Sequence, residues 1–173
     1  MASPCTRSRR AFLELLWHVG AAQIDLVSLA AENVDWENRT ISYCRRKNNS
    51  LAILRFGDEV ATILRQLPAD GPLFPNFSKI SSSDRAARFH HRCKVLGISG
   101  VSLHSYRYAW AERAKSAGYP QRYAQEALGH QSAAIHRAYA KQARVELPPL
   151  EEFERQIAER KVVGRPALSA AAP

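Results

Sequence analysis

One short part of the chain has the pattern of paired β-strands, and the segments on both sides of it have a helical pattern. Residues 39–43 and 51–54 are rich in β-forming residues, and Lys47-Asn-Asn-Ser50 between them supplies turn residues. This arrangement predicts an antiparallel hairpin with Lys47 at or near its tip. Since the other regular segments are helical, the sequence predicts a mostly helical α+β domain with one small antiparallel sheet.

Apolar residues at helical spacing, together with capping and breaking residues, predict where the helices lie. Asp58 is suited to cap one helix, and the serines before Asp84 start another. Prolines and a glycine around Leu73 and Phe74 predict a loop. The expected helices cover residues 7–19, 23–30, 58–67, 81–97, 103–117, 121–128, 133–143 and 149–160.

The chain is long enough for one domain with a sizeable core. It has 173 residues, 46% of them hydrophobic, and it contains no internal repeat. We expect one domain over residues 1–161. Residues 162–173 are mostly small and include prolines, so we expect a disordered tail there.

The chain carries an excess of positive charge. Lys and Arg number 25 against 16 Asp and Glu, which gives a formal net charge of +9. Cations held near phosphates release condensed counterions, so a polyanionic partner is the natural inference. Many basic domains never touch nucleic acid, and charge alone does not decide between these alternatives.

The cysteines and the hydropathy indicate the cell compartment. Cys5, Cys44 and Cys93 are odd in number, widely spaced and without zinc-ligand spacing, which predicts reduced thiols and neither a disulfide nor a metal site. No apolar run approaches the roughly 20 residues of a membrane span, and the N-terminus lacks a signal-peptide pattern. We therefore expect a cytoplasmic protein with no membrane partner.

Two groups of residues are candidates for chemistry. His104 and Arg107 are three residues apart in a predicted helix and so share one face, where both could contact one anion. Gly129 lets the chain turn sharply after the next helix and presents His130 from a loop, and Tyr139 follows nine residues later. Each alone has an ordinary explanation as a surface or core pair, a capping histidine or a structural tyrosine.

Taken together and in this order, these residues resemble the second conserved box of the tyrosine recombinases, the phage integrase family. The matching text is Leu103-His-Ser-Tyr-Arg107, then Glu126-Ala-Leu-Gly-His130, then Ala138-Tyr139. The hairpin with Lys47 and the loop Pro72-Leu-Phe-Pro75 extend the resemblance over roughly residues 11–145. It implies the catalytic-domain fold of this family and an enzyme that cuts and rejoins DNA in the integration or excision of a mobile element.

The resemblance implies a role for each of five catalytic residues. Tyr139 attacks the scissile phosphate and leaves a 3′-phosphotyrosyl link and a free 5′-hydroxyl, with no metal or cofactor. Arg107 donates a fork of hydrogen bonds to the phosphate, and His130 donates another. His104 transfers the proton of Tyr139, and Lys47 protonates the leaving 5′-oxygen.

The resemblance also implies double-stranded DNA as the partner, contacted by Lys47, Arg107 and the neighbouring Arg45 and Arg46. It implies a monomer in solution, a homotetramer on DNA and association with the nucleoid when DNA is bound. The N-terminal helical domain, the core-binding domain with which these enzymes clamp the duplex, has no counterpart in the sequence, so we expect a catalytic domain alone.

The chain departs from the family at the position of the first catalytic arginine. That stretch reads His18-Val-Gly-Ala-Ala22-Gln-Ile-Asp25, which places Ala22 where the arginine is expected. Losing one transition-state donor costs about 100- to 1000-fold in rate. Arg45 and Arg46 are candidates to replace the missing charge, whereas Gln23 could supply hydrogen bonds without charge.

Two further positions bear on the site. Asp25 matches an acidic residue that supports the family's active site from behind, although a helix-surface carboxylate is an equal alternative. Tyr108 stands where the family commonly has histidine. We interpret Tyr108 as packing, because the helix face that follows includes Trp110 and is otherwise apolar.

Three functions remain open from the sequence. The first is a site-specific recombinase that acts through Tyr139. The second is a catalytically impaired relative that only binds DNA, because Ala22 replaces the arginine. The third, a type IB topoisomerase, shares the fold and the tyrosine chemistry, but the text Leu128-Gly-His130 is integrase-like.

Overall fold

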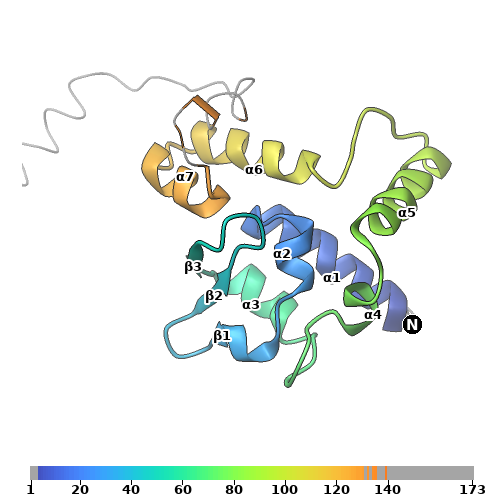
Figure 1. The fold of residues 1–173 in the computed structure, drawn as a ribbon, viewed down its shortest axis with the longest axis horizontal. Helices are drawn as coiled ribbons and strands as arrows, with labels where there is room; N and C mark the ends of the chain where they lie inside the picture. The colour runs from blue at the N-terminus through green and yellow to red at the C-terminus, as the bar shows by residue number, and fades with distance from the viewer. Residues whose placement is uncertain (1–3, 131, 133, 136–138, 140–173) are drawn as a thin grey trace, which may run out of the picture.

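The computed structural model describes residues 4–130, 132, 134, 135 and 139, and Figure 1 shows their course. A mostly helical α+β domain with a small antiparallel sheet is confirmed. The helices are α1 (Pro4–Val19), α2 (Gln23–Val27), the 3-10 helix η1 (Ala31–Asn33), α3 (Asp58–Leu64), α4 (Pro75–Ser78), α5 (Ser82–Val95), α6 (Ser105–Ser116) and α7 (Gln121–Leu128). The strands are β1 (Val34–Asp35), β2 (Thr40–Cys44) and β3 (Leu51–Arg55).

The sheet is antiparallel, with strand order β1-β2-β3. The predicted hairpin is confirmed, since β2 pairs with β3 in a register that sets Ser42 opposite Ile53. The sequence did not predict β1, which sets Val34 opposite Ile41 and is too short to show an alternating pattern. Ile41 and Tyr43 of β2 are both buried, because alternate residues of a strand face the same side.

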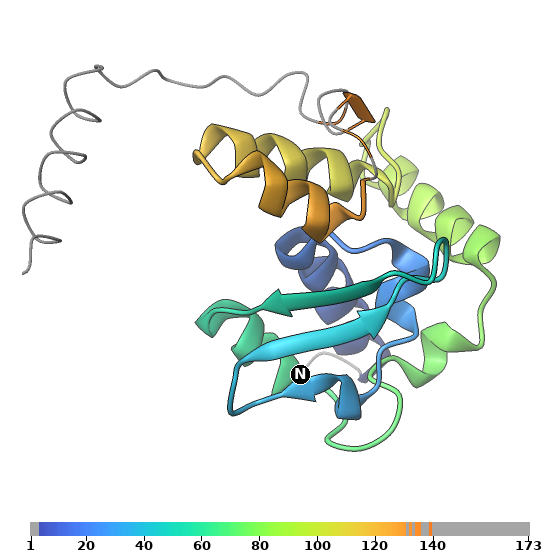
Figure 2. The same ribbon diagram turned by 60° about the vertical axis from the view of Figure 1, so that its left-hand side comes forward.

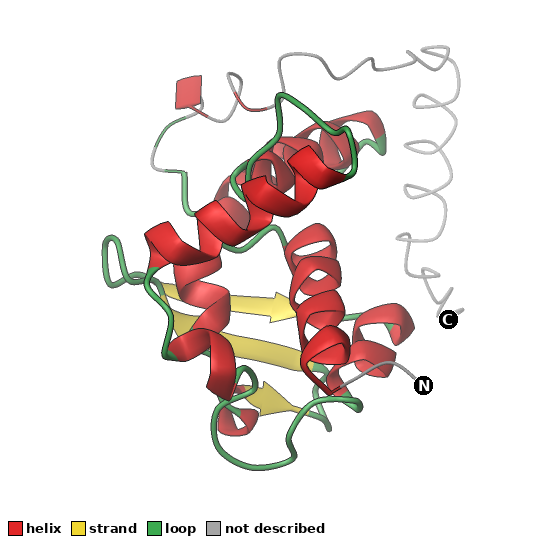
Figure 3. Ribbon diagram, turned by 90° about the vertical axis from the view of Figure 1, so that its right-hand side faces the viewer, coloured by secondary structure: helices red, strands yellow, loops and turns green. Residues whose placement is uncertain are grey.

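Helices α1 and α3 cover one face of this sheet, as Figures 2 and 3 show from different sides. Helix α1 buries Phe12, Leu15 and Leu16, whose spacing places them on one helical face. The Phe12 ring stacks on Phe77 with centroids 4.9 Å apart and meets Phe74 edge-on at 5.3 Å. Phe74 of the predicted loop and Phe77 of α4, a helix that the sequence did not predict, therefore supply part of the core that holds α1 in place.

Helices α6 and α7 pack against each other and rest on α1 and β3 (Figure 1). The contact between α6 and α1 is tight at Trp110, whose Nε1 donates to the backbone oxygen of His18 at 3.0 Å. The ring lies over Gly20, where an added Cβ would stand 2.7 Å from Trp110 Cγ. Gly20 also has φ +66°, so both the backbone and the packing require glycine there.

Several predicted helix ends differ from the structure. The helix expected over residues 23–30 ends at Val27, and the one expected over residues 58–67 ends at Leu64. The prediction that Asp58 caps a helix was wrong, because Gly57 occupies the N-cap position and Asp58 is the first helical residue. The Asp58 carboxylate instead forms an ion pair with Arg39.

Other predictions hold or fall outside the described residues. Helix α5 starts in the serine cluster as predicted, and Ser81 caps it, its hydroxyl accepting from the Asp84 backbone nitrogen at 3.1 Å. Cys44 and Cys93 are free cysteines. Within the helix expected over residues 133–143, residues 134, 135 and 139 are described and are helical. The helix expected over residues 149–160 and the tail at 162–173 lie outside the described residues. Among the residues described, no helix is long and apolar enough to cross a membrane.

Candidate active site

Three separate segments bring four of the five predicted catalytic residues together. His104 immediately precedes α6, as its N-cap, and Arg107 lies one turn further along. Helix α7 ends at Gly129, whose φ of +64° turns the chain so that His130 leaves the helix axis. Tyr139 comes back to this point, and its ring contacts those of His104 and His130. Residues from separate parts of the sequence thus form one cluster, which lies between the start of α6 and the end of α7.

Tyr139 is held on several sides by other rings. Its hydroxyl lies 2.8 Å from His104 Nε2, within hydrogen-bond distance. The His130 ring lies against it with centroids 4.3 Å apart and planes tilted by 56°. Tyr108 stacks on it nearly parallel, at 4.2 Å and 11°. The Tyr139 hydroxyl is therefore within reach of an imidazole nitrogen, and the Tyr139 ring is packed against Tyr108 and His130.

Arg107 lies beside Tyr139 and is held by backbone oxygens. Its Nη1 donates to the Gly20 backbone oxygen at 2.8 Å, and its Nη2 donates to the backbone oxygen of Leu128. Burial lowers the pKa of Arg107 from its ordinary value, while the nearby Tyr139 and Tyr43 act in the opposite direction. A guanidinium remains charged at neutral pH despite such a shift, so the cluster holds a fixed positive charge beside the phenol.

His104 is an acid–base group with a shifted equilibrium. Part of its ring is exposed, but burial of the rest lowers the pKa of His104 from its ordinary value, and the charge of Arg107 lowers it further. The neutral imidazole therefore predominates at neutral pH. A neutral ring nitrogen 2.8 Å from a phenol oxygen is suited to accept its proton.

Arg45 occupies a structural position that sequence reasoning missed. It is buried, and its guanidinium donates to the backbone oxygens of Glu126 and Ala127 at the end of α7. It also contacts Ser50 and Leu51 across its own hairpin turn. A cation at a helix C-terminus satisfies carbonyls that lack helical partners. The expectation that Arg45 contacts DNA or replaces the missing arginine disagrees with this burial, because its donors are engaged inside the protein.

The hairpin turn lies beside α2. The buried carboxylate of Asp25 accepts from the Arg46 backbone nitrogen at 2.8 Å. Asp25 thus supports the turn that carries Arg46 and Lys47, and the alternative of a helix-surface carboxylate is excluded by its burial. Both basic side chains are exposed, and among the described residues Lys47 makes no hydrogen bond or ion pair. The structure therefore brings Tyr139, His104, His130 and Arg107 together but leaves Lys47 free at the turn.

At the position where the first catalytic arginine was expected, Ala22 supplies no charged side chain. It is the N-cap of α2, and its backbone oxygen accepts from the nitrogens of Asp25 and Leu26. The neighbouring Gln23 accepts from Arg85 Nε at 3.1 Å through its side-chain oxygen. Gln23 is therefore tied to α5 through that oxygen.

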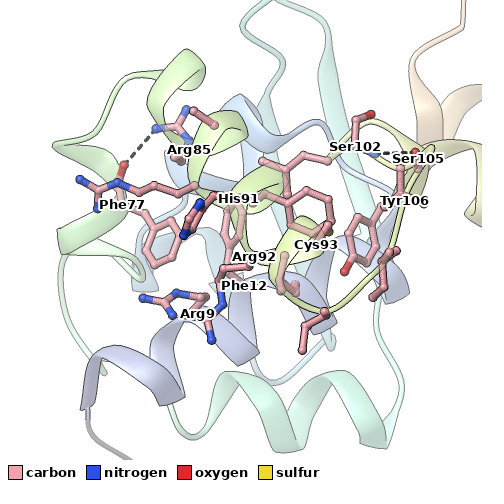
Figure 4. Close-up of a pocket in the computed structure, with 18 of the residues that line it drawn as sticks. Arg9, Phe12, Phe77, Arg85, His91, Arg92, Cys93, Ser102, Ser105 and Tyr106 are labelled. Carbon is pink, nitrogen blue, oxygen red and sulfur yellow. Dashed lines mark hydrogen bonds between the residues drawn. The ribbon is translucent and has the colours of Figure 1, made fainter.

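A separate pocket of about 960 Å³ lies between α1, α5 and the segment that leads into α6 (Figure 4). Phe12, Phe77 and Tyr106 contribute to a mostly apolar lining, and Arg9 and Arg92 add positive charge. None of the clustered residues His104, Arg107, His130 and Tyr139 lines it. This pocket is distinct from the candidate active site.

Comparison with known proteins bears on this arrangement. The family model described as the phage integrase family matches residues 2–145. The chain belongs to this family. A tyrosine recombinase XerD of Pasteurella multocida is 30% identical over 158 residues, which is 83% of this chain and 53% of that protein. A tyrosine recombinase XerC of Roseiflexus castenholzii is 29% identical over 146 residues, 75% of this chain and 46% of that protein. The chain spans about half the length of these relatives.

Solved structures of integrases and recombinases share the fold. The Tn1549 transposon integrase in complex with transposon right end DNA superposes with a TM-score of 0.69 at 12% identity, covering 92% of this chain and 61% of that chain. The XerA recombinase superposes with a TM-score of 0.65 at 20% identity, covering 91% and 58%. The predicted catalytic-domain fold is thereby confirmed.

Proposed function

We propose that this chain cuts and rejoins DNA at specific sites, through a covalent 3′-phosphotyrosyl intermediate at Tyr139. One observation carries the proposal: the Tyr139 hydroxyl lies 2.8 Å from His104 Nε2 at a point where Arg107 supplies positive charge. A nucleophile, a base and a cation at one point are what displacement at a phosphodiester needs. The membership of the phage integrase family supports the same reaction.

The reaction follows from these positions. The neutral His104 takes the proton of Tyr139 as the phenol oxygen attacks phosphorus, and the bond from phosphorus to the 5′-oxygen breaks. Lys47 is the proposed donor of the proton that the departing 5′-oxygen takes up. Arg107 and His130 donate to the nonbridging oxygens, where negative charge accumulates. Rejoining runs through the same groups in reverse, with a 5′-hydroxyl attacking the phosphotyrosine.

Double-stranded DNA is the proposed partner. The net charge of +9 supports it, as does the exposure of Arg46 and Lys47 at the hairpin turn. The Tn1549 integrase was solved with transposon DNA, and the XerH recombinase with its difH substrate. We extend the proposal to a monomer in solution, a homotetramer on DNA, action on a mobile element, and a cytoplasmic protein that joins the nucleoid when it binds DNA.

A second function, DNA binding without cleavage, is favoured by Ala22. No guanidinium extends from this position, and Arg45 is held by α7. Arg46, exposed at the hairpin turn, is the remaining one of the two arginines that were candidates to replace the missing charge. If no cation takes that role, the cleavage rate falls by about 100- to 1000-fold, and DNA binding becomes the main activity.

The test is a nicked suicide duplex, which traps the covalent intermediate because the cut fragment diffuses away. We expect the wild-type chain to give a denaturation-resistant protein–DNA adduct, and Tyr139→Phe, which lacks the attacking oxygen, to give none. Retarded DNA without an adduct, in a trap that detects a reaction slowed about 1000-fold, would leave DNA binding as the function.

A further inference from the structure

Tyr108 makes the closest parallel ring contact in the candidate active site, although its sequence position indicated only packing. It lies four residues after His104, so one helical turn separates them and both side chains lie on the same side of α6. Its ring stacks on that of Tyr139 with centroids 4.2 Å apart and planes 11° from parallel. It also meets His104 edge-on, at 5.4 Å and 77°. One side chain therefore touches both members of the proposed nucleophile–base pair.

We propose that Tyr108 is a positioning residue that holds the Tyr139 ring so that its hydroxyl stays on His104 Nε2. The inference rests on the proposed function of Tyr139 as nucleophile. Tyr108 acts through the two rings it touches, and its own hydroxyl has no part in the reaction.

The geometry explains why Tyr139 needs such a support. Its ring is packed on one side by the small cluster of Ala111 and Leu128, and the edge-on and tilted histidine contacts do not fix its plane. A parallel neighbour restricts the ring plane, and the ring plane sets the direction of the hydroxyl. Attack on phosphorus needs the oxygen within a narrow range of position and angle, so a less restricted ring reacts more slowly.

A merely structural role is a poor explanation of this contact. Tyr108 is 42% exposed, so its removal uncovers little core. The buried part of α6 nearby is Ala111, which packs with Leu128 without Tyr108. The stacking energy of an aromatic pair corresponds to about a two- to ten-fold change in an equilibrium. The stacking energy therefore favours one orientation of the Tyr139 ring. It contributes little to the free energy of unfolding, because Tyr108 is exposed.

The test compares Tyr108→Phe, which keeps the ring, with Tyr108→Leu, which removes it. In single-turnover cleavage of the nicked suicide duplex we expect Tyr108→Phe to match the wild type and Tyr108→Leu to be slower by about two- to ten-fold. Urea unfolding should place both variants close to the wild type. A rate loss in Tyr108→Phe as large as that in Tyr108→Leu would overturn the inference, because the hydroxyl would then be the active part.

A second readout does not depend on cleavage. The chain has six tyrosines, and uniform labelling with 3-fluorotyrosine gives each a ¹⁹F resonance; the one lost in Tyr139→Phe belongs to Tyr139. We expect that resonance to keep its position in Tyr108→Phe and to move toward that of an unstructured chain in Tyr108→Leu. An unmoved resonance in Tyr108→Leu would overturn the positioning role.

The two readouts separate the inference from the proposed function. If the wild type forms no adduct, the proposed function fails, and the ¹⁹F spectrum still decides whether Tyr108 orients Tyr139. If the wild type forms an adduct at the same rate as Tyr108→Leu, cleavage stands and the positioning role is wrong, whatever the resonance does.

Discussion

The contact between Gly129 and Arg45 ties the hairpin to the loop that carries His130, and a single methyl group should break it. An added Cβ at Gly129 would stand 2.6 Å from Arg45 Nε and 2.8 Å from its Cδ, both in the middle of a buried side chain. The residue also has φ +64°, in the left-handed region. Gly129→Ala therefore forces Arg45 off the backbone oxygens of Glu126 and Ala127.

The size of the effect follows from two terms. A residue with a Cβ in the left-handed conformation costs about 1–2 kcal/mol. Displacing the guanidinium gives up hydrogen bonds from a charged donor, each worth about 1.5–3 kcal/mol, and water recovers part of this. We expect Gly129→Ala to lower the free energy of unfolding by about 2.5–5 kcal/mol. Gly118→Ala is the matched control, since Gly118 has φ +70° but no atom within 4 Å of its Cβ position, and should cost about 1–2 kcal/mol.

Urea unfolding followed by tryptophan fluorescence measures both variants, and an Arg45→Ala background isolates the contact. In that background Gly129→Ala should cost no more than Gly118→Ala does, because the clashing side chain is absent. The expected coupling energy between the two positions is about 1.5–3 kcal/mol. If Gly129→Ala and Gly118→Ala cost the same in the wild-type background, the reasoning about Arg45 is refuted.

Three further predictions concern the site. The lowered pKa of His104 means that its neutral form persists below pH 6.5, so single-turnover cleavage should fall with a midpoint below pH 6.5 as the ring is protonated; a midpoint above 6.5 would contradict the proposed base. Ala22→Arg should raise the cleavage rate by about 100- to 1000-fold in the suicide-duplex assay, and an unchanged rate would mean that another cation already serves. Asp25→Ala should cost about 1–3 kcal/mol in urea unfolding, because the Arg46 backbone nitrogen loses its acceptor, while Asp25→Asn, which keeps an oxygen there, should cost less.

The fold was predictable where local patterns are strong. The hairpin, the capped start of α5 at Ser81 and the glycine that ends α7 follow from residue types that act on their immediate neighbours. The ends of α2 and α3 were not predictable, because the residues that follow, Ser28-Leu-Ala30 and Arg65-Gln-Leu67, do not include a glycine or proline that would stop a helix. After α2 the chain instead pairs with a distant segment, through the bridge between Ala30 and Pro72. Strand β1 has no recognisable pattern in the sequence, because it has only two residues and forms by pairing with β2.

The site also has a part that the sequence predicted and a part that it did not. The resemblance to the tyrosine recombinases implied one site made of His104, Arg107, His130 and Tyr139, and the structure brings these four residues together. The buried position of Arg45 was not predictable, because its partners are backbone oxygens about 80 residues away, and no sequence pattern reports a backbone acceptor. The stacking of Tyr108 on Tyr139 was hidden for a related reason: the i, i+4 spacing to His104 was visible, but the partner ring comes from outside the helix.

The attachment of DNA to Tyr139 is tested most directly by asking which DNA end stays on the protein and through which residue. A suicide duplex labelled at the 5′ end of the cleaved strand is incubated with the chain, the adduct is digested with trypsin, and the DNA-linked peptide is sequenced by mass spectrometry. The proposal predicts that the 5′-labelled fragment remains attached through its 3′-phosphate, on the peptide that contains Tyr139. A link at another residue, or attachment of the opposite fragment through a 5′-phosphate, would contradict it.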